Sequence, residues 1–274
     1  MGSLFVVATP IGNLEDTTLR AIRLLREVQL IAAEDTRTTR ILLRKYDIHT
    51  RTLSYNEHNM RRRTPQLLAA LGSGDVALVS EAGTPGVSDP GHELITAAIE
   101  AGFPVVPIPG PSALIAALVA SGLPMRQFTF LGFLSRRPAE RRHSLADLAG
   151  APRTLVVFEA PHRLRSLLSD MLFVLGDRRI ALCRELTKAF EEVFRGSVSE
   201  ALEHFSDPRG EFTIIIEGAT NQQPVSDESV RRHLQEARDR GLSARDAVKA
   251  VTAATGRSRR EVYALWLKLS DDQH

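Results

Sequence analysis

The amino-acid sequence predicts an α/β protein with a parallel-sheet N-terminal domain, a mixed-sheet second domain and a small C-terminal helical appendage. Three observations predict this fold class. Short, fully apolar strand-like runs alternate with helical segments from the N-terminus, as in a parallel sheet that helices cover on both faces. A second series of strand-like runs follows Gly122, and only helical patterns remain after Gly218. At 274 residues, the chain is long enough for two domains and an appendage.

The first domain is expected to span residues 1–116. The helix after its first strand is expected to bury Leu19, Ile22, Leu25 and Val28 on one face, because these residues recur at helical spacing. The predicted strands are residues 4–8, 30–33, 51–54, 76–79 and 104–108.

The fourth predicted strand runs into a loop rich in glycine and proline at residues 80–91. Pro85-Gly86 suits the central positions of a type II turn, because proline fixes φ at the first and glycine tolerates a positive φ at the second. Asp89 and Pro90 are expected to be the N-cap and first residue of the next helix. A strand, a loop of small residues and a helix start are typical of a ligand site at the carboxyl edge of a sheet.

The second domain is expected to span residues 117–220. Gly196 and the stretch 190–194 indicate at least one antiparallel strand, which makes the sheet mixed. The other predicted strands are residues 128–133, 154–158, 180–183 and 212–216, with helices near 141–148, 163–175 and 198–205.

The appendage is expected to span residues 221–274, with a polar linker at 219–227 and helices at 230–237, 244–252 and 260–269. Ser243 and Ser258 are good N-caps after the glycine turns that separate these helices. Two short helices joined by a turn that contains Arg257 resemble a helix-turn-helix. The same pattern fits a three-helix appendage that packs on its own domain or on a partner subunit.

The composition excludes several classes of protein. Cys183 is the single cysteine, so an intramolecular disulfide and a multi-cysteine metal site are excluded, and the chain suits the reducing cytoplasm. No apolar run approaches membrane-spanning length, and residues 4–8 are too short for a signal-peptide core. The sequence contains no phosphate-binding P-loop, no G-x-G-x-x-G after the first strand, no G-x-S-x-G elbow and no metal-ligand spacing, so no metal is expected.

Unusual small and polar residues follow four strands of the first domain, at residues 9–13, 34–37, 80–85 and 109–112. The carboxyl ends of parallel strands meet at one edge of a sheet, so these four loops are expected to line a single crevice. Their small residues and few carboxylates suit a neutral or cationic ligand held largely by backbone groups. The second domain places further polar residues after its strands, at 158–163 and 184–188.

Arginine clusters interrupt a nearly neutral chain of net charge +2. They occur at Arg61-Arg62-Arg63, at Arg136-Arg137 with Arg141-Arg142, and at Arg257 with Arg259-Arg260. Each cluster fits a solvated face, and together they are compatible with a polyanionic partner.

The motifs in these loops resemble those of the ribosomal RNA small-subunit methyltransferase I family, within the tetrapyrrole methylase superfamily. The resemblance covers about residues 4–218, and the C-terminal helices resemble the helix-turn-helix appendage of that family. The sequence departs from the family at Glu81, where aspartate is frequent, and at Gly86-Val87, where a bulkier pair is expected. The motifs that carry the resemblance are T-P-I-G-N-L at residues 9–14, A-E-D-T-R at 33–37, S-E-A-G-T-P at 80–85, D-P-G at 89–91, P-G-P-S-A at 109–113 and R-E-L-T-K at 184–188.

The resemblance implies two α/β domains of the tetrapyrrole methylase type, with S-adenosylmethionine in the cleft between them and usually a homodimer. It implies methylation of a cytidine 2′-hydroxyl in the decoding region of 16S rRNA, within the small ribosomal subunit. The residues expected around the cofactor are Pro10, Gly12, Ser80, Ala82, Gly83, Thr84, Pro109, Gly110, Ser112, Ala113 and Phe158.

A ribose hydroxyl is a poor nucleophile until a nearby group accepts its proton. In this interpretation Glu81, Asp35 and Glu185 are candidate proton acceptors, while Lys188 and Arg184 are candidates to steady developing charge or hold a phosphate. The residues expected to contact RNA are Arg61, Arg62, Arg63, Arg163 and Arg184.

Two alternative functions remain open from the sequence. One is a methylase of the same superfamily that acts on a small tetrapyrrole-like molecule. The other is a non-catalytic RNA-binding assembly factor that uses the helix-turn-helix. The arginine clusters and the appendage favour RNA over a small substrate, and binding of S-adenosylmethionine separates an enzyme from an assembly factor.

Overall fold

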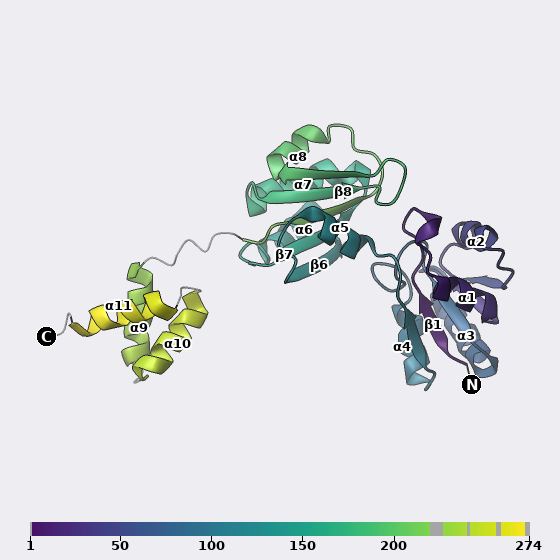
Figure 1. Ribbon diagram of the computed structural model, residues 1–274, viewed down its shortest axis with the longest axis horizontal. Coiled ribbons are helices and arrows are strands. Elements are labelled where there is room, and N and C mark those ends of the chain that lie inside the picture. Colours follow the sequence, from purple (N-terminus) through teal and green to yellow (C-terminus); the bar gives the residue numbers. More distant parts are fainter. Residues whose placement is uncertain (1, 220–226, 240–241, 256–258, 272–274) are drawn as a thin grey trace. The chain divides into compact units, whose positions relative to one another are not determined.

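The computed structural model describes residues 2–219, 227–239, 242–255 and 259–271. Contacts divide the chain into two units, Met1–Gly218 and Ala219–His274. Figure 1 shows two sheets in the first unit and the helices α9 to α11 in the second. No helix in the described part of the chain is both long enough and apolar enough to cross a membrane.

The first sheet is parallel throughout, as the apolar strand pattern predicts. Among the described residues its strands lie in the order β3-β2-β4-β1-β5, with β2, β4 and β1 in the interior. Leu4 pairs with both Val76 and Val105, so the carboxyl ends of the central strands reach the same edge. The strands are β1 (Leu4–Val7), β2 (Leu30–Ala33), β3 (Thr52–Ser54), β4 (Val76–Val79) and β5 (Val105–Ile108).

Helices cover both faces of this sheet because its interior strands are apolar on both sides. Alternate residues of β4 serve the two faces: Ala77 and Val79 pack with α1 (Leu19–Glu27) and α2 (Thr36–Lys45). Val76 and Leu78 pack with residues of α3 (Met60–Ser73) and α4 (His92–Glu100).

Two local predictions in this domain are wrong. Leu19 is 86% exposed, because α1 buries the stripe that contains Ala21, Leu24 and Leu25, and Leu19 lies on the opposite side of the helix. Asp89 does not cap α4, which begins at His92 after Gly91. The type II turn is as predicted: the Val87 amide donates to the Thr84 carbonyl over 3.2 Å, and Gly86 has a φ of 84°.

The second sheet is mixed, with the strand order β6-β7-β10-β8-β9 among the described residues. β6 and β7 are parallel, whereas β10 is antiparallel to both β7 and β8, and β8 is antiparallel to β9. The fold class is therefore confirmed, and the antiparallel pairs agree with the prediction of at least one antiparallel strand. The strands are β6 (Phe128–Phe133), β7 (Thr154–Glu159), β8 (Arg179–Arg184), β9 (Glu192–Ser197) and β10 (Phe212–Ile216).

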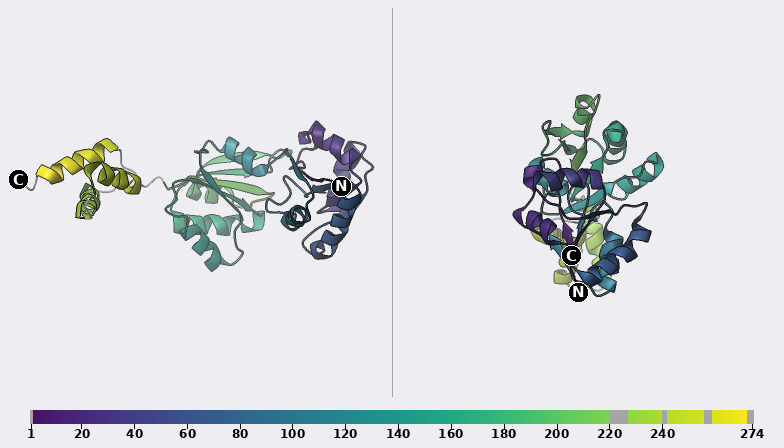
Figure 2. Two further views of the ribbon diagram at one scale, coloured as in Figure 1. Left: turned by 90° about the horizontal axis from the view of Figure 1, so that it is seen from below. Right: turned by 90° about the vertical axis from the view of Figure 1, so that its right-hand side faces the viewer.

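Helices also lie on both sides of the second sheet (Figure 2). One face packs against α6 (Pro138–Ala146), α7 (Pro161–Leu175) and α8 (Val198–His204). The other face packs against α5 (Ala113–Ser121), which spans the predicted boundary between residues 116 and 117. The predicted boundary between residues 220 and 221 lies outside the described residues.

The second unit has its own apolar core. Its described residues form α9 (Asp227–Asp239), α10 (Ala244–Thr255) and α11 (Arg259–Asp271). Ser243 caps α10 as predicted, since its Oγ accepts from the Asp246 amide over 3.2 Å. The predicted turn at residues 256–258 and most of the predicted linker lie outside the described residues. The core side chains are Val230, Leu234, Val248, Val251, Val262 and Leu265.

Candidate functional site

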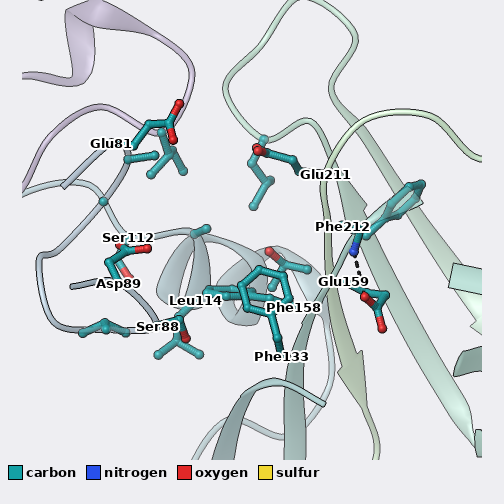
Figure 3. A pocket seen from close by; sticks show the side chains of 18 of the residues that line it. Glu81, Ser88, Asp89, Ser112, Leu114, Phe133, Phe158, Glu159, Glu211 and Phe212 are labelled. Carbon is teal, nitrogen blue, oxygen red and sulfur yellow. Dashed lines mark hydrogen bonds between the residues drawn. The ribbon is translucent and has the colours of Figure 1, made fainter. Parts of the chain in front are cut away.

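A cavity of about 550 Å³ lies at the carboxyl edge of the first sheet. All four predicted strand ends reach it: Ile11 follows β1, Glu34 follows β2, Glu81 follows β4 and Ser112 follows β5. The second sheet closes the cavity with residues that include Phe133, Phe158, Glu211 and Phe212. The site therefore draws on both sheets of the first unit, as Figure 3 shows.

The loops after β1 and β4 are tied to each other behind the cavity wall. Thr9 and Gly83 exchange two backbone hydrogen bonds, of 2.9 and 3.0 Å. The buried Ser80 hydroxyl donates to the Gly83 carbonyl over 3.2 Å, and the Thr9 hydroxyl donates to the Ser80 carbonyl over 3.2 Å. Gly83 has a φ of 80°, which favours glycine at this point of the wall.

One end of the cavity is acidic. Glu34, Glu81 and Asp89 all line it, and Glu34 Oε2 accepts a hydrogen bond of 2.9 Å from the Glu81 amide. Burial raises the pKa of Glu34, and neighbouring carboxylates add to the shift. Burial, followed by the charges of Glu34 and Glu81, raises the pKa of Asp89 to about 7. Glu211 lies across the cavity from Glu81 (Figure 3).

The other side of the cavity is apolar and aromatic. The rings of Phe133 and Phe158 meet edge to face with centroids 5.7 Å apart, and both lie beside Leu114 of α5 (Figure 3). Phe133 remains 56% exposed, so a flat ligand can reach its ring. Ile11 and Val87 add further apolar surface to the lining.

The residues predicted to surround a cofactor fall into two groups. Ala82, Gly83, Thr84, Ser112, Ala113 and Phe158 line the cavity. Pro10, Gly12, Ser80, Pro109 and Gly110 are not among its described lining residues.

Gly12 and Gly110 support the wall from behind. A Cβ at Gly110 would lie 3.0 Å from Ala8 Cβ, so Gly110 lets the ends of β1 and β5 approach each other. A Cβ at Gly12 would lie 2.4 Å from Lys188 Cγ, so Gly12 lets the loop after β1 approach the loop after β8.

Of the three proton acceptors predicted from the sequence, only Glu81 lines the cavity. Asp35 instead caps α2 and pairs with Arg37 over 2.7 Å; hydrogen bonds from Arg37 lower the pKa of Asp35 to about 2. Glu185 pairs with Lys188 over 2.9 Å. Burial opposes the shift, but hydrogen bonds from the Glu211 amide and from Lys188 hold the pKa of Glu185 below its ordinary value.

Lys188 also pairs with Glu211 over 3.0 Å, so its ammonium joins two carboxylates beside the cavity. Burial opposes the shift, but the hydrogen bonds to these two carboxylates raise the pKa of Lys188, which keeps it charged. Lys188 itself is not among the described lining residues.

The arginines predicted to contact RNA differ in their exposure and in their contacts within the protein. Arg61 and Arg62 are exposed at the start of α3, whereas Arg63 donates to Gln66 over 2.8 Å. Arg163 is only 14% exposed; its Nε lies 3.1 Å from Oε1 of the buried Glu159. The Arg184 guanidinium also forms an ion pair and a hydrogen bond within the protein.

The Arg184 Nη1 atom lies 3.1 Å from Glu192 Oε2, and its Nε donates to the Arg209 carbonyl over 2.7 Å. Arg163 and Arg184 therefore hold their own domain together, and a role for either in RNA binding stays a prediction.

Sequence reasoning misses several lining residues. Asp89 has a local signal, but Asp-Pro before an apolar helical pattern also fits an N-cap. Glu34 directly precedes the predicted Asp35. Phe133 ends β6 and Glu211 directly precedes β10, and no local pattern indicates which residues of this region face the first sheet. Among the described residues, no group of three histidine, cysteine, aspartate or glutamate side chains is arranged to hold a metal.

Comparison with known proteins identifies the family. The profile of the tetrapyrrole (corrin/porphyrin) methylases matches residues 3–202. The chain is 44% identical over 275 residues to ribosomal RNA small subunit methyltransferase I of Halalkalibacterium halodurans, covering 97% of this chain and 94% of the relative. The chain is a member of the ribosomal RNA small subunit methyltransferase I family.

Further similarities cover both units. The Synechocystis member of this methyltransferase I family is 46% identical, over 99% of this chain and 100% of that protein. The RsmI C-terminal HTH domain profile matches residues 224–270. The crystal structure of uroporphyrin-III C-methyltransferase from Thermus thermophilus, complexed with S-adenosylhomocysteine, shares the fold. Its TM-score is 0.57 at 23% identity, over 79% of this chain and 97% of that one.

Proposed function

We propose that this protein transfers a methyl group from S-adenosylmethionine to the 2′-hydroxyl of a cytidine in the decoding region of 16S rRNA. The names of its relatives support a small-subunit rRNA substrate. The observation that carries the proposal is a cavity lined both by carboxylates, among them Glu34, Glu81 and Asp89, and by the rings of Phe133 and Phe158. We expect the protein to work in the cytoplasm with the small ribosomal subunit as its partner. We also expect a homodimer, and light scattering tests this by measuring the mass of the protein in solution.

The lining residues fit S-adenosylmethionine. Its sulfonium is a cation, and the described lining residues include Glu34, Glu81 and Asp89 but no lysine or arginine. Phe133 and Phe158 offer apolar surface to an adenine ring. Both backbone groups of Gly83 bond Thr9, but no described hydrogen bond uses the backbone amides of Ala82, Thr84 and Ser112, which are available for its polar atoms. When bound, the cofactor supplies an electrophilic methyl group.

The protein's own contribution is to orient the ribose and to accept its proton. Methyl transfer is a displacement that needs the attacking oxygen in line with the bond between the methyl group and sulfur. The hydrogen bonds between Thr9 and Gly83 hold the cavity wall in place, and a fixed wall helps to keep the two reactants aligned. Asp89 is the preferred proton acceptor, because it lines the cavity and its pKa of about 7 lies near the working pH. Asp35 and Glu185 are neutralised by cations and have lowered pKa values, which makes them weak bases.

The test supplies methyl-labelled S-adenosylmethionine together with three acceptors. These are small ribosomal subunits from cells that lack the enzyme, a naked 16S rRNA transcript and a porphyrinoid. We expect label in the rRNA, released on digestion as 2′-O-methylcytidine. Label confined to the porphyrinoid supports the small-molecule alternative and overturns the proposal. Calorimetry that detects no binding of S-adenosylmethionine favours the non-catalytic assembly factor.

A matched pair of variants locates the cofactor. Ala82→Trp places a large ring in the cavity lining and is expected to abolish binding of S-adenosylmethionine. Ala69→Trp places the same ring on the exposed side of α3 and is expected to bind normally. Calorimetry measures both, and normal binding by a folded Ala82→Trp protein places the cofactor elsewhere.

A further inference from the structure

The third helix of the second unit, α11, has two unlike faces. Val262 and Leu265 are buried in the three-helix core, and Trp266 and Leu269 pack against it. The exposed side carries other residues of the helix at spacings of three and four. These are Arg259, Arg260, Tyr263, Ala264, Leu267 and Lys268, here called the α11 outer face.

The α11 outer face combines positive charge with apolar surface. Tyr263 is 49% exposed and Leu267 is 47% exposed, and the two lie one turn apart on the same side of the helix. Within the described part of the chain, no hydrogen bond or ion pair occupies Arg259, Arg260 or Lys268. The exposed Glu261 lies about 160° around the helix from Tyr263, on the side of Lys268, so the charge beside the tyrosine is the positive charge of Arg259 and Arg260.

The other two helices lack this combination. The exposed residues of α9 mix Arg231 and Arg232 with acidic Glu228 and Glu236. On α10, Asp246 lies among the exposed basic residues Arg245 and Lys249. The described exposed large apolar side chains of these helices and α11 are Tyr263 and Leu267, both on α11.

We propose that the α11 outer face binds unpaired rRNA, with Tyr263 stacked on a base and Arg259 and Arg260 on the flanking phosphates. The proposal rests on the rRNA substrate proposed above and adds the surface that captures it. Single-stranded RNA is recognised by aromatic stacking combined with cationic contacts to the backbone, and the α11 outer face offers both. Arg259 and Arg260 also open the helix, where the backbone dipole favours an anion.

The arginine test uses two equal charge changes in the same three-helix unit. The double variant Arg259→Ser/Arg260→Ser removes two adjacent arginines from α11, and Arg231→Ser/Arg232→Ser removes two from α9. Filter binding of the full-length protein to a 16S rRNA transcript is measured over a salt series. For the α11 variant, we expect the slope of log K against log salt to fall by about 1.4 units, which is about 0.7 for each lost phosphate contact. The α9 variant is expected to keep the native slope.

The tyrosine test separates stacking from simple apolar packing. Tyr263→Ala is expected to bind the transcript roughly 5- to 150-fold more weakly with an unchanged salt slope, since stacking on an aromatic is uncharged. Tyr263→Phe keeps the ring and is expected to keep the affinity. Tyr263→Leu keeps the apolar bulk and is expected to bind as weakly as the alanine variant. Full binding by Tyr263→Leu overturns stacking, because it shows that apolar bulk without an aromatic ring is enough for binding to the transcript.

The methyl-transfer assay distinguishes failure of this inference from failure of the proposed function. If the native protein methylates rRNA, the α11 variants are expected to raise KM for small ribosomal subunits and to leave kcat and S-adenosylmethionine affinity unchanged. Native KM, affinity and salt slope in these variants overturn the α11 assignment alone. No rRNA methylation by the native protein, with its transcript binding intact, overturns the proposed function alone.

Discussion

At the scale of single residues, two aspartates in similar sequence positions have different surroundings in the structure. Asp35 and Asp89 both follow strands of the first sheet, but Asp35 pairs with Arg37 and Asp89 lies among other carboxylates. The environment therefore moves their pKa values in opposite directions, to about 2 and about 7. Only a carboxylate of the second kind is suited to exchange protons near neutral pH.

Asp89→Asn tests this difference. Asp89 accepts a proton only when deprotonated, so native kcat is expected to rise with pH up to about 7 and then level off. The variant is expected to lose roughly 10²- to 10⁴-fold in kcat and to lose that inflection. Single-turnover methyl transfer over a pH series measures both. Asp35→Asn is the control and is expected to keep the inflection in kcat near pH 7. An inflection that persists in Asp89→Asn would show that another group accepts the proton of the ribose hydroxyl.

Two glycine-to-alanine variants are expected to change stability in opposite directions. Gly83 has a φ of 80°, so Gly83→Ala forces an L-residue into left-handed backbone and costs about 1–2 kcal/mol. Gly72 lies in α3, and a Cβ added there would meet no atom within 4 Å, so Gly72→Ala stabilises by roughly 0.5–1 kcal/mol. Urea unfolding measures both. Equal changes in the free energy of unfolding for the two variants would show that the backbone at Gly83 changes conformation without strain.

At the scale of elements, α6 and α7 are joined by buried charge. Arg141 Nε donates to Asp170 Oδ2 over 2.7 Å and Arg142 Nε donates to Oδ1 over 2.6 Å. Arg141 and Asp170 are almost fully buried, whereas Arg142 is half-exposed. Such a pair stabilises little relative to an apolar pair, yet loss of one partner leaves a buried charge without compensation.

Asp170→Ala is therefore expected to destabilise the protein by about 3–5 kcal/mol, because Arg141 remains buried without its partner. Arg142→Ala removes the exposed arm of the same cluster and is expected to cost at most about 1 kcal/mol. Denaturant titrations of the two variants provide the comparison. A small loss for Asp170→Ala would mean that water reaches Arg141.

The elements also show which features the sequence can predict. The interior strands of the first sheet, β1, β2 and β4, are recognisable because burial on both faces makes them continuously apolar. The start of α4 is harder to place, because Asp89-Pro90 satisfies a local capping rule while Gly91 continues the loop before the helix begins. Phe133 and Glu211 escape prediction because their place in the cavity depends on how the two sheets meet, which local spacing does not encode.

At the scale of the whole molecule, the two proposed binding sites lie in different units. The described cavity lining runs from Ile11 to Thr213, entirely within the first unit, and the second unit has a separate core. Binding of the methyl donor and capture of RNA can therefore be separated by experiment.

A chain that ends after Gly218 is expected to bind S-adenosylmethionine as the full chain does, because every described lining residue is retained. Its affinity for 16S rRNA is expected to fall at least as far as that of Tyr263→Ala, roughly 5- to 150-fold. Calorimetry and filter binding measure the two quantities. Native rRNA affinity in the shortened chain would place RNA capture in the first unit.

The position of β10 determines how late in synthesis the second sheet and the cavity wall can be completed. Among the described strands β10 is the last in the chain, yet it occupies the middle of the second sheet between β7 and β8. Until it pairs, the second sheet is split, and Phe212 and Thr213 are absent from the cavity wall. A nascent chain that stops before β10 emerges therefore has an incomplete wall around the cavity in which we propose that the methyl donor binds.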